Sequence, residues 1–222
     1  MGDAVKKTES EGALRARALR IIARLKTLFP DADCSLMYQN PLQLLIATIL
    51  SAQCTDERVN KVTPGLFGRF PTAADYAKAP LAAIEEAVRS TGFYRNKAKA
   101  IQSCCQALVE QHGGAVPASM AALTALKGVG RKTANVVLGN AFGMAEGVVV
   151  DTHVRRISNR LGLTRQQDPV KIEQDLVVRV PREDWTLFSH LLIRHGRATC
   201  TARSPRCEAC DLDVVCPSRG QV

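Results

Sequence analysis

MAALTALKGVGRKTANVVLGNAFG spans residues 120–143 and contains two helical patterns joined by Gly128-Val129-Gly130. Two glycines one residue apart allow positive φ and a close approach of the backbone to a partner. The N–H groups that begin the second helix, helped by the helix dipole, form a site for an anion. The segment is either a plain packing hairpin or a hairpin that binds a phosphate diester of DNA. The run GVGRKTA in a basic chain favours phosphate.

The charge of the whole chain points the same way. Its 222 residues have a formal net charge of +9 at pH 7, which favours polyanions, and nucleic acid is the commonest of these. The N-terminus has no apolar core of signal-peptide length, and the apolar run near Leu42–Leu50 is too short to cross a bilayer. We therefore expect a cytoplasmic, nucleoid-associated protein with no membrane partner.

Helical periodicity dominates the remaining sequence. Leu14, Ile21, Ile22, Leu25 and Leu28 form one apolar stripe. Helix starts are predicted where a capping or turn residue precedes a periodic segment, at Asn40-Pro41, Thr72, Pro80 and Asp168-Pro169.

Glycines mark the expected helix ends. The long pattern of residues 94–111 is followed by Gly113-Gly114, and the pattern of residues 185–195 is followed by Gly196. Only GVVVD, residues 147–151, has strand character, and it is too short to build a sheet. The sequence thus predicts an all-α fold of about ten helices. Residues 1–11 are polar and are predicted to be a disordered tail.

Two residues near the hairpin have chemistry beyond packing. Lys132 lies in the first helical turn, where the dipole disfavours a positive charge and favours the neutral amine that a nucleophile needs. A simple phosphate contact is the alternative. Asp151 precedes the helical pattern THVRRISNRLGL and is predicted to be its N-cap.

Four of the eight cysteines lie close to the C-terminal end with the spacing C-x6-C-x2-C-x5-C: Cys200, Cys207, Cys210 and Cys216. Disulfides are rare in the cytosol, so a metal site is favoured. Structural zinc sites use two close pairs, whereas only Cys207 and Cys210 form one here, so zinc and a [4Fe–4S] cluster are about equally supported by the spacing. Cys34, Cys54, Cys104 and Cys105 are predicted to be small core residues.

The hairpin closely resembles the helix-hairpin-helix motif of the endonuclease III family of DNA glycosylases and abasic-site lyases. LLIATILSAQCTD (residues 44–56), TGFYRNKA (residues 91–98), GVVVDTHVRRISNRLGL (residues 147–163) and the cysteine segment follow in the same order and at similar spacing. The resemblance covers about residues 14–217, and several unrelated motifs agree.

The resemblance implies a two-lobed helical fold with a DNA-binding groove between the lobes. Residues 34–144 would form a central helical domain that contains the hairpin. Residues 12–33 and 145–222 would form a second lobe that ends in the cluster loop. The protein would act as a monomer on double-stranded DNA with damaged or abasic sites.

The resemblance also implies roles for individual residues. Lys132 would attack C1′ of the damaged nucleotide, giving a Schiff base and then β-elimination, and Asp151 would stabilise charge as an oxidised pyrimidine leaves. Because the nucleotide must be flipped out of the duplex, Gln53 and Phe93 would hold the opposite strand. Phe93 departs from the leucine known in the family, and Lys127 from its usual proline.

The remaining implied contacts concern phosphate and metal. Gly128, Val129 and Gly130 would bind a phosphate, and Arg203 and Arg206 of the cysteine segment would face others. The family uses this cysteine spacing for a [4Fe–4S] cluster, which favours iron–sulfur over zinc. Two other functions are weighed against this one: a non-catalytic helix-hairpin-helix DNA-binding protein, and an adenine-specific mismatch glycosylase, which lacks the lysine.

Overall fold

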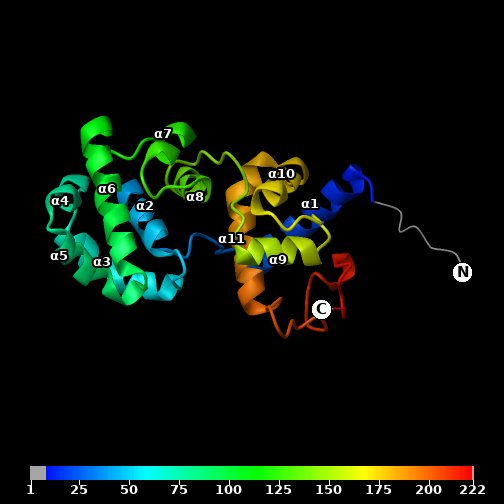
Figure 1. Ribbon diagram of the computed structural model, residues 1–222. Coiled ribbons are helices and arrows are strands. Elements are labelled where there is room, and N and C mark those ends of the chain that lie inside the picture. The colour runs from blue at the N-terminus through cyan, green and yellow to red at the C-terminus, as the bar shows by residue number, and fades with distance from the viewer. Residues whose placement is uncertain (1–8, 222) are drawn as a thin grey trace, which may run out of the picture. The chain divides into compact units, whose positions relative to one another are not determined.

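The computed structural model describes residues 9–221, and all regular elements in this range are helices (Figure 1). This confirms the predicted all-α fold. Residues 147–151, which have strand character in the sequence, run without pairing to another strand. None of the helices in the described range combines the length and the apolar character of a bilayer-spanning segment.

The chain divides into two compact units. The central unit is the continuous segment Cys34–Glu146. Among the described residues, the terminal unit combines residues 9–33 with residues 147–221, so that segments far apart in the sequence share one core.

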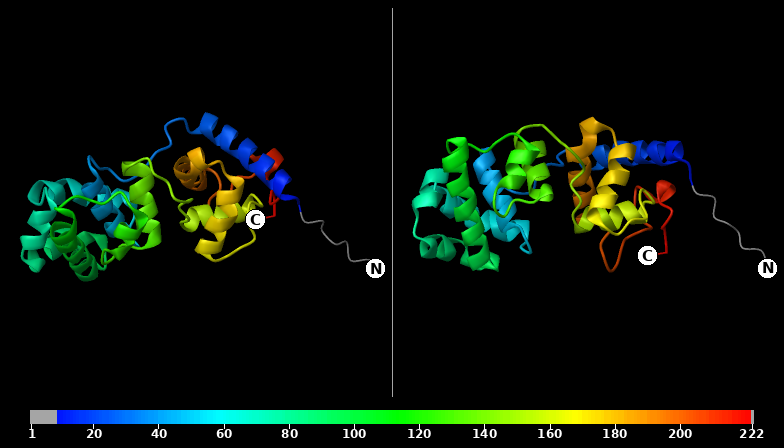
Figure 2. Two further views of the ribbon diagram at one scale, coloured as in Figure 1. Left: turned by 90° about the horizontal axis from the view of Figure 1, so that it is seen from above. Right: turned by 45° about the horizontal axis from the view of Figure 1, so that its top comes forward.

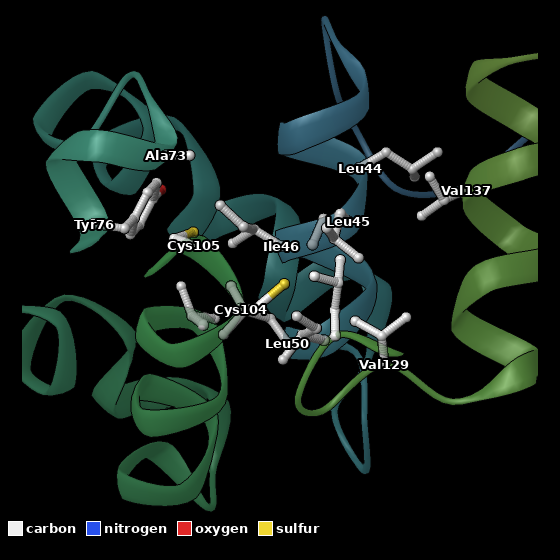
Figure 3. Close-up of a cluster of buried hydrophobic side chains, with 14 of the residues drawn as sticks. Leu44, Leu45, Ile46, Leu50, Ala73, Tyr76, Cys104, Cys105, Val129 and Val137 are labelled. Atoms are coloured by element: carbon white, nitrogen blue, oxygen red, sulfur yellow. The ribbon is translucent and has the colours of Figure 1, made fainter. Parts of the chain in front are cut away.

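The central unit contains seven α-helices and one short 3-10 helix: α2 (Pro41–Leu50), α3 (Asp56–Arg69), α4 (Ala73–Lys78), α5 (Leu81–Val88), η1 (Arg89–Thr91), α6 (Tyr94–His112), α7 (Met120–Ala125) and α8 (Arg131–Ala141). The helices α4 and α5 pack against α6, and α2 packs against α8. Every residue of α2 from Leu44 onward is buried, so this helix forms the middle of the core (Figure 3).

The terminal unit contains α1 (Glu11–Leu28), α9 (Thr152–Arg160), α10 (Pro169–Arg179), η2 (Arg182–Asp184), α11 (Trp185–Ala198) and η3 (Asp213–Val215). The first helix, α1, packs against α10 and α11 (Figure 2). Polar contacts join the same segments, because the Arg179 guanidinium donates to Glu11 and the Arg17 guanidinium donates to the Leu161 carbonyl. The N-terminal helix is therefore an integral part of this unit.

The predicted helix starts are confirmed by the caps. Asn40 Oδ1 accepts from the Gln43 amide at 3.0 Å, and the Asp168 carboxylate accepts from two amides of α10. Thr72 and Asp75 cap each other reciprocally, and Pro80 immediately precedes α5. The C-terminus of α6 is also as predicted, since Gly113 adopts the left-handed conformation that ends the helix.

Three expectations need correction. Residues 1–8 of the predicted tail lie outside the described residues, but Ser10 accepts from the Ala13 amide and α1 already begins at Glu11. Gly196 does not end α11; it lies inside the helix, where an added Cβ would be 2.6 Å from Ile157 Cδ1. Leu28, at the end of the predicted stripe, is 37% exposed because α1 ends there.

Candidate functional site

The glycine hairpin joins α7 and α8 in the central unit. Its turn is closed by the Val129 amide, which donates to the Leu126 carbonyl at 3.1 Å. The side chain of Val129 is 5% exposed and belongs to the core, as Figure 3 shows. Because its side chain is buried and its N–H is bonded within the turn, Val129 anchors the turn, and its contact with DNA stays a prediction.

The two glycines of the hairpin differ in conformation. Gly128 has φ +83°, the left-handed region that favours glycine. Gly130 has φ −90° and ψ 172°, which any residue adopts, and it is the N-cap of α8 without a side-chain hydrogen bond. An added Cβ at Gly130 would meet no atom within 4 Å. Gly128 therefore shapes the turn, whereas Gly130 leaves open space in front of the helix.

That open space faces the first turn of α8, which begins with Arg131 and Lys132. The amides of the first turn of any α-helix have no acceptor within the helix, and the dipole makes this end electropositive. Lys132 is exposed, while Ala134 and Asn135 on the other side of the helix are buried. An accessible amine thus lies next to a site suited to an anion.

Asp151 is the N-cap of α9 in the terminal unit, as predicted. One carboxylate oxygen, Oδ1, accepts from the Val154 amide at 2.8 Å, and the other, Oδ2, lies 3.3 Å from His153 Nδ1. The hydrogen bond from Val154 fixes the carboxylate in place, and because the side chain is about 20% exposed, a ligand can still reach it. Lys132, by contrast, belongs to the central unit.

A second histidine belongs to the surroundings of Asp151, although the sequence pattern did not single it out. Burial lowers the pKa of His190, and the nearby carboxylates of Asp33 and Asp151 partly oppose that effect. His190 lies on α11, and only the packing of α11 beside α9 brings it to Asp151. Spacing along the chain contains no signal for this proximity.

Gln53 and Phe93 share an unusual backbone conformation. In residues 9–221 they are the non-glycine residues with positive φ, at +51° and +46°. Such a conformation is strained for an aromatic residue and is often found at functional sites. Both side chains are exposed, and that of Phe93 reaches 64%. An exposed phenyl ring on a strained turn is available for stacking.

The four C-terminal cysteines line one cavity that is open to solvent. Burial raises the pKa values of the Cys210 and Cys216 thiols, and the other thiols nearby add to this effect. Within the described residues, no three His, Cys, Asp or Glu side chains converge as ligands of a single metal ion. The thiols therefore surround a space instead of meeting at one point.

Arg160, at the end of α9, connects this cysteine loop to the rest of the terminal unit. Its guanidinium donates to Cys200 Sγ at 3.3 Å and to the carbonyls of Thr201 and Ala202. Its own carbonyl accepts from Cys216 Sγ at 3.6 Å. The sequence predicts no role for Arg160, because nothing in its local pattern distinguishes it from the other arginines of α9.

His195 is a second residue that the sequence analysis missed. It is 2% exposed, and its Nε2 lies 3.9 Å from Cys210 Sγ. Burial lowers the pKa of His195 to about 4. A neutral imidazole is therefore packed against one of the four thiols.

The two arginines predicted to face phosphates behave differently. Arg203 is exposed. The guanidinium of Arg206 donates to the Ala198 carbonyl, and its amide donates to the Thr199 carbonyl at 3.0 Å. Arg206 thus holds the cysteine loop against the end of α11, and a phosphate would have to share its guanidinium.

Comparison with known proteins agrees with this arrangement. Residues 46–182 match the HhH-GPD superfamily of base excision DNA repair proteins. Endonuclease III of Synechocystis sp. is 57% identical over 92% of this chain and 93% of that protein. Endonuclease III of Escherichia coli is 41% identical over 94% and 98%. The structure of a non-covalent endonuclease III–DNA complex has a TM-score of 0.88 and 42% identity, and the match covers 96% of this chain and 98% of that one.

The helical fold, the glycine hairpin and the four-cysteine loop define a helix-hairpin-helix DNA-repair protein. With most of its length matched, the chain belongs to the HhH-GPD superfamily of base excision DNA repair proteins. It is a DNA glycosylase and lyase of base excision repair.

Proposed function

We propose that the protein removes oxidised pyrimidines from double-stranded DNA and cleaves the resulting abasic site, with Lys132 as the nucleophile. The observation that carries this proposal is the exposed Lys132 amine on the first turn of α8, beside the glycine hairpin. A phosphate held by the first-turn amides would keep the DNA backbone next to this amine. Because the proposed substrate is damaged double-stranded DNA, the protein would act on the chromosome, at the nucleoid.

The reaction begins at the sugar of a flipped nucleotide. The lone pair of Lys132 Nζ forms a bond to C1′, the C1′–N bond breaks, and the base leaves with that electron pair and takes up a proton. Loss of the amine proton and opening of the sugar ring give a Schiff base between Nζ and C1′. Removal of a proton from C2′ then expels the 3′ phosphate by β-elimination, and water releases the enzyme.

Asp151 is proposed to stabilise the positive charge that develops on the sugar as the base departs. The Val154 amide fixes one carboxylate oxygen, so the group does not have to reorganise during the reaction. His153, 3.3 Å from the other oxygen, is placed to share a proton with it. A fixed carboxylate is worth more in such a role than a mobile one, because its orientation is set before the charge appears.

Gln53 and Phe93 are proposed to hold the strand opposite the flipped nucleotide. Unstacking a base costs a few kcal/mol, and a side chain that fills the vacated space offsets part of this. The exposed phenyl ring can stack on a neighbouring base. Arg203 and the hairpin residues Gly128 and Gly130 would add contacts to phosphates, which carry no sequence information.

A [4Fe–4S] cluster is proposed to be held by Cys200, Cys207, Cys210 and Cys216. On one zinc ion, with Zn–S near 2.3 Å, four sulfurs would be roughly 3.8 Å apart. The thiols instead surround one cavity and, within the described residues, do not converge as ligands of a single ion, which supports a group that binds them at separate atoms. The cluster would supply no step of the reaction; it would order the loop that contains Arg203 and Arg206.

The test is borohydride trapping on a duplex with an abasic site. We expect Lys132→Gln to abolish both strand cleavage and the borohydride-stable adduct. Binding to the duplex should stay within a few fold of the unaltered protein, because one cation contributes a small part of the electrostatic affinity. Lys127→Gln, an exposed lysine in the same hairpin, is the matched control and should keep both activities.

Three results would contradict the proposal. A borohydride-stable adduct at near-normal yield with Lys132→Gln would show that another amine attacks C1′. Equal losses of binding and cleavage would indicate that Lys132 only contacts a phosphate. A protein that binds abasic DNA but never cleaves it, with Lys132 in place, would be the non-catalytic alternative.

A further inference from the structure

Lys97 is a buried cation in the central unit that the proposed reaction does not use. Its side chain lies on α6 and is 5% exposed, whereas lysines are almost never fully buried without a partner. The Nζ group donates to the Thr91 carbonyl at 2.7 Å, and Thr91 itself is buried. Burial lowers the pKa of Lys97, as expected for an amine removed from water.

The acceptor of this hydrogen bond lies at the base of a strained turn. Thr91 is followed by Gly92, with φ +70°, and by Phe93, with φ +46°. The backbone amide of Lys97 donates to the Phe93 carbonyl at 3.1 Å. The Lys97 side chain therefore holds the Thr91 end of the turn, while the first backbone hydrogen bond of α6 holds its Phe93 end.

We propose that Lys97 is a positioning residue that holds the Phe93 turn in its left-handed conformation, so that the phenyl ring is presented to the strand opposite a damaged nucleotide. This inference rests on the proposed DNA contact of Phe93. The left-handed backbone conformation of a non-glycine residue costs about 1–3 kcal/mol, and it persists only where the surrounding contacts hold it in place. The charge-assisted hydrogen bond from the buried Lys97 amine to the Thr91 carbonyl holds the turn in this conformation.

A purely structural role makes a different prediction. A buried lysine that only stabilises the fold would, when replaced, lower the free energy of unfolding and weaken all DNA binding alike. A lysine that positions the Phe93 turn would affect the complex with damaged DNA more than the complex with intact DNA, because only a flipped nucleotide leaves a space for Phe93 to fill.

The test measures binding to two duplexes, one intact and one containing tetrahydrofuran, an abasic analogue that cannot undergo β-elimination. Lys97→Met removes the amine while keeping the length of the side chain. We expect it to weaken binding to the tetrahydrofuran duplex about tenfold and to change binding to intact DNA less than about twofold. Lys99→Met, an exposed lysine on the same helix, is the control and should affect both duplexes equally.

A double-mutant cycle separates positioning from general destabilisation. If Lys97 acts through Phe93, then Lys97→Met should have little further effect on tetrahydrofuran binding when Phe93→Ala is already present. Additive losses would overturn the positioning role while leaving the proposed function intact. No effect of Phe93→Ala on tetrahydrofuran binding would instead contradict the proposed DNA contact itself.

Folding of the variants is checked by circular dichroism. If Lys97→Met does not fold, Lys97→Gln keeps a donor at a similar position and replaces it in the cycle. If neither variant folds, Lys97 is needed for the entire central unit, and the specific positioning role is wrong.

Discussion

Gly128 lies so close to Ala100 that a methyl group added at Gly128 would be 2.9 Å from the Ala100 Cβ. The glycine hairpin is thus pressed against α6, the helix that also contains Lys97. Positive φ at Gly128 adds to the steric conflict. Gly130, two residues later, has neither constraint.

This contrast predicts that two alanine substitutions affect different properties, stability at Gly128 and DNA binding at Gly130. Gly128→Ala should lower the free energy of unfolding by about 1–3 kcal/mol, through backbone strain and the clash with Ala100. Gly130→Ala should leave stability within about 0.5 kcal/mol and weaken DNA binding, because its methyl group occupies the space for a phosphate. Urea unfolding and a salt titration of DNA binding measure the two effects. Equal DNA affinity for Gly130→Ala and the unaltered protein would exclude the phosphate site.

Asp151→Asn should slow base removal more than cleavage of a preformed abasic site. Asparagine is as good an N-cap as aspartate, so α9 should remain stable, while the negative charge that stabilises the sugar is lost. We expect base release to fall on the order of 100-fold, measured by single-turnover kinetics on an oxidised pyrimidine. The control is Asp168→Asn, which changes the N-cap of α10 in the same unit. An equal slowing of both steps would show that Asp151 acts on the lyase reaction as well.

The purified protein should contain about four iron atoms per chain and absorb visible light. Cys210→Ser should lose both iron and colour, and it should lower solubility more than it affects base removal, because the metal orders the loop. Arg160→Met should reduce iron content without removing a ligand, since it deletes the contacts to Cys200, Thr201 and Ala202. One zinc per chain and no iron, from cells grown with iron, would rule the cluster out.

Tyr76→Phe should increase the free energy of unfolding by about 1 kcal/mol. The Tyr76 hydroxyl is fully buried and has no hydrogen-bond partner among the described residues, and an unsatisfied buried group is costly. The ring itself would keep its contact with Phe70, at 5.1 Å between centroids. Tyr38→Phe is the matched control and should be destabilising, because that hydroxyl donates to the Asn140 carbonyl at 3.0 Å. Destabilisation by both substitutions would show that Tyr76 has a partner.

The features that the sequence predicts well are those set by neighbouring residues. Asn40, Thr72 and Asp168 cap helices because their side chains bond to amides two or three residues away, and such contacts can be inferred from spacing. Asp151 was identified as an N-cap for the same reason. The hairpin was located from its glycines, although their separate roles were not.

The features that the sequence misses depend on residues far away in the chain. Gly196 was taken as a helix end, whereas its small size makes room for Ile157 on another helix. Lys97 and Lys99 cannot be told apart by spacing, yet only Lys97 is buried, on the face of α6 that meets Thr91. His195 lies beside a thiol only because Cys210, fifteen residues later in the chain, folds back against it.

The joining of α1 to the chain beyond Gly147 has a consequence for synthesis on the ribosome. The central unit is continuous and has all its helices as soon as Glu146 has emerged. In contrast, α1 emerges first but finds Leu161, Asp211 and Arg179 only when the last part of the chain appears. At a synthesis rate of ~5–20 residues per second, the apolar face of α1 remains without its packing partners for a time on the order of ten seconds. The terminal unit is therefore the last to fold. A nascent chain halted before Gly147 would contain a folded hairpin and a first helix without its packing partners.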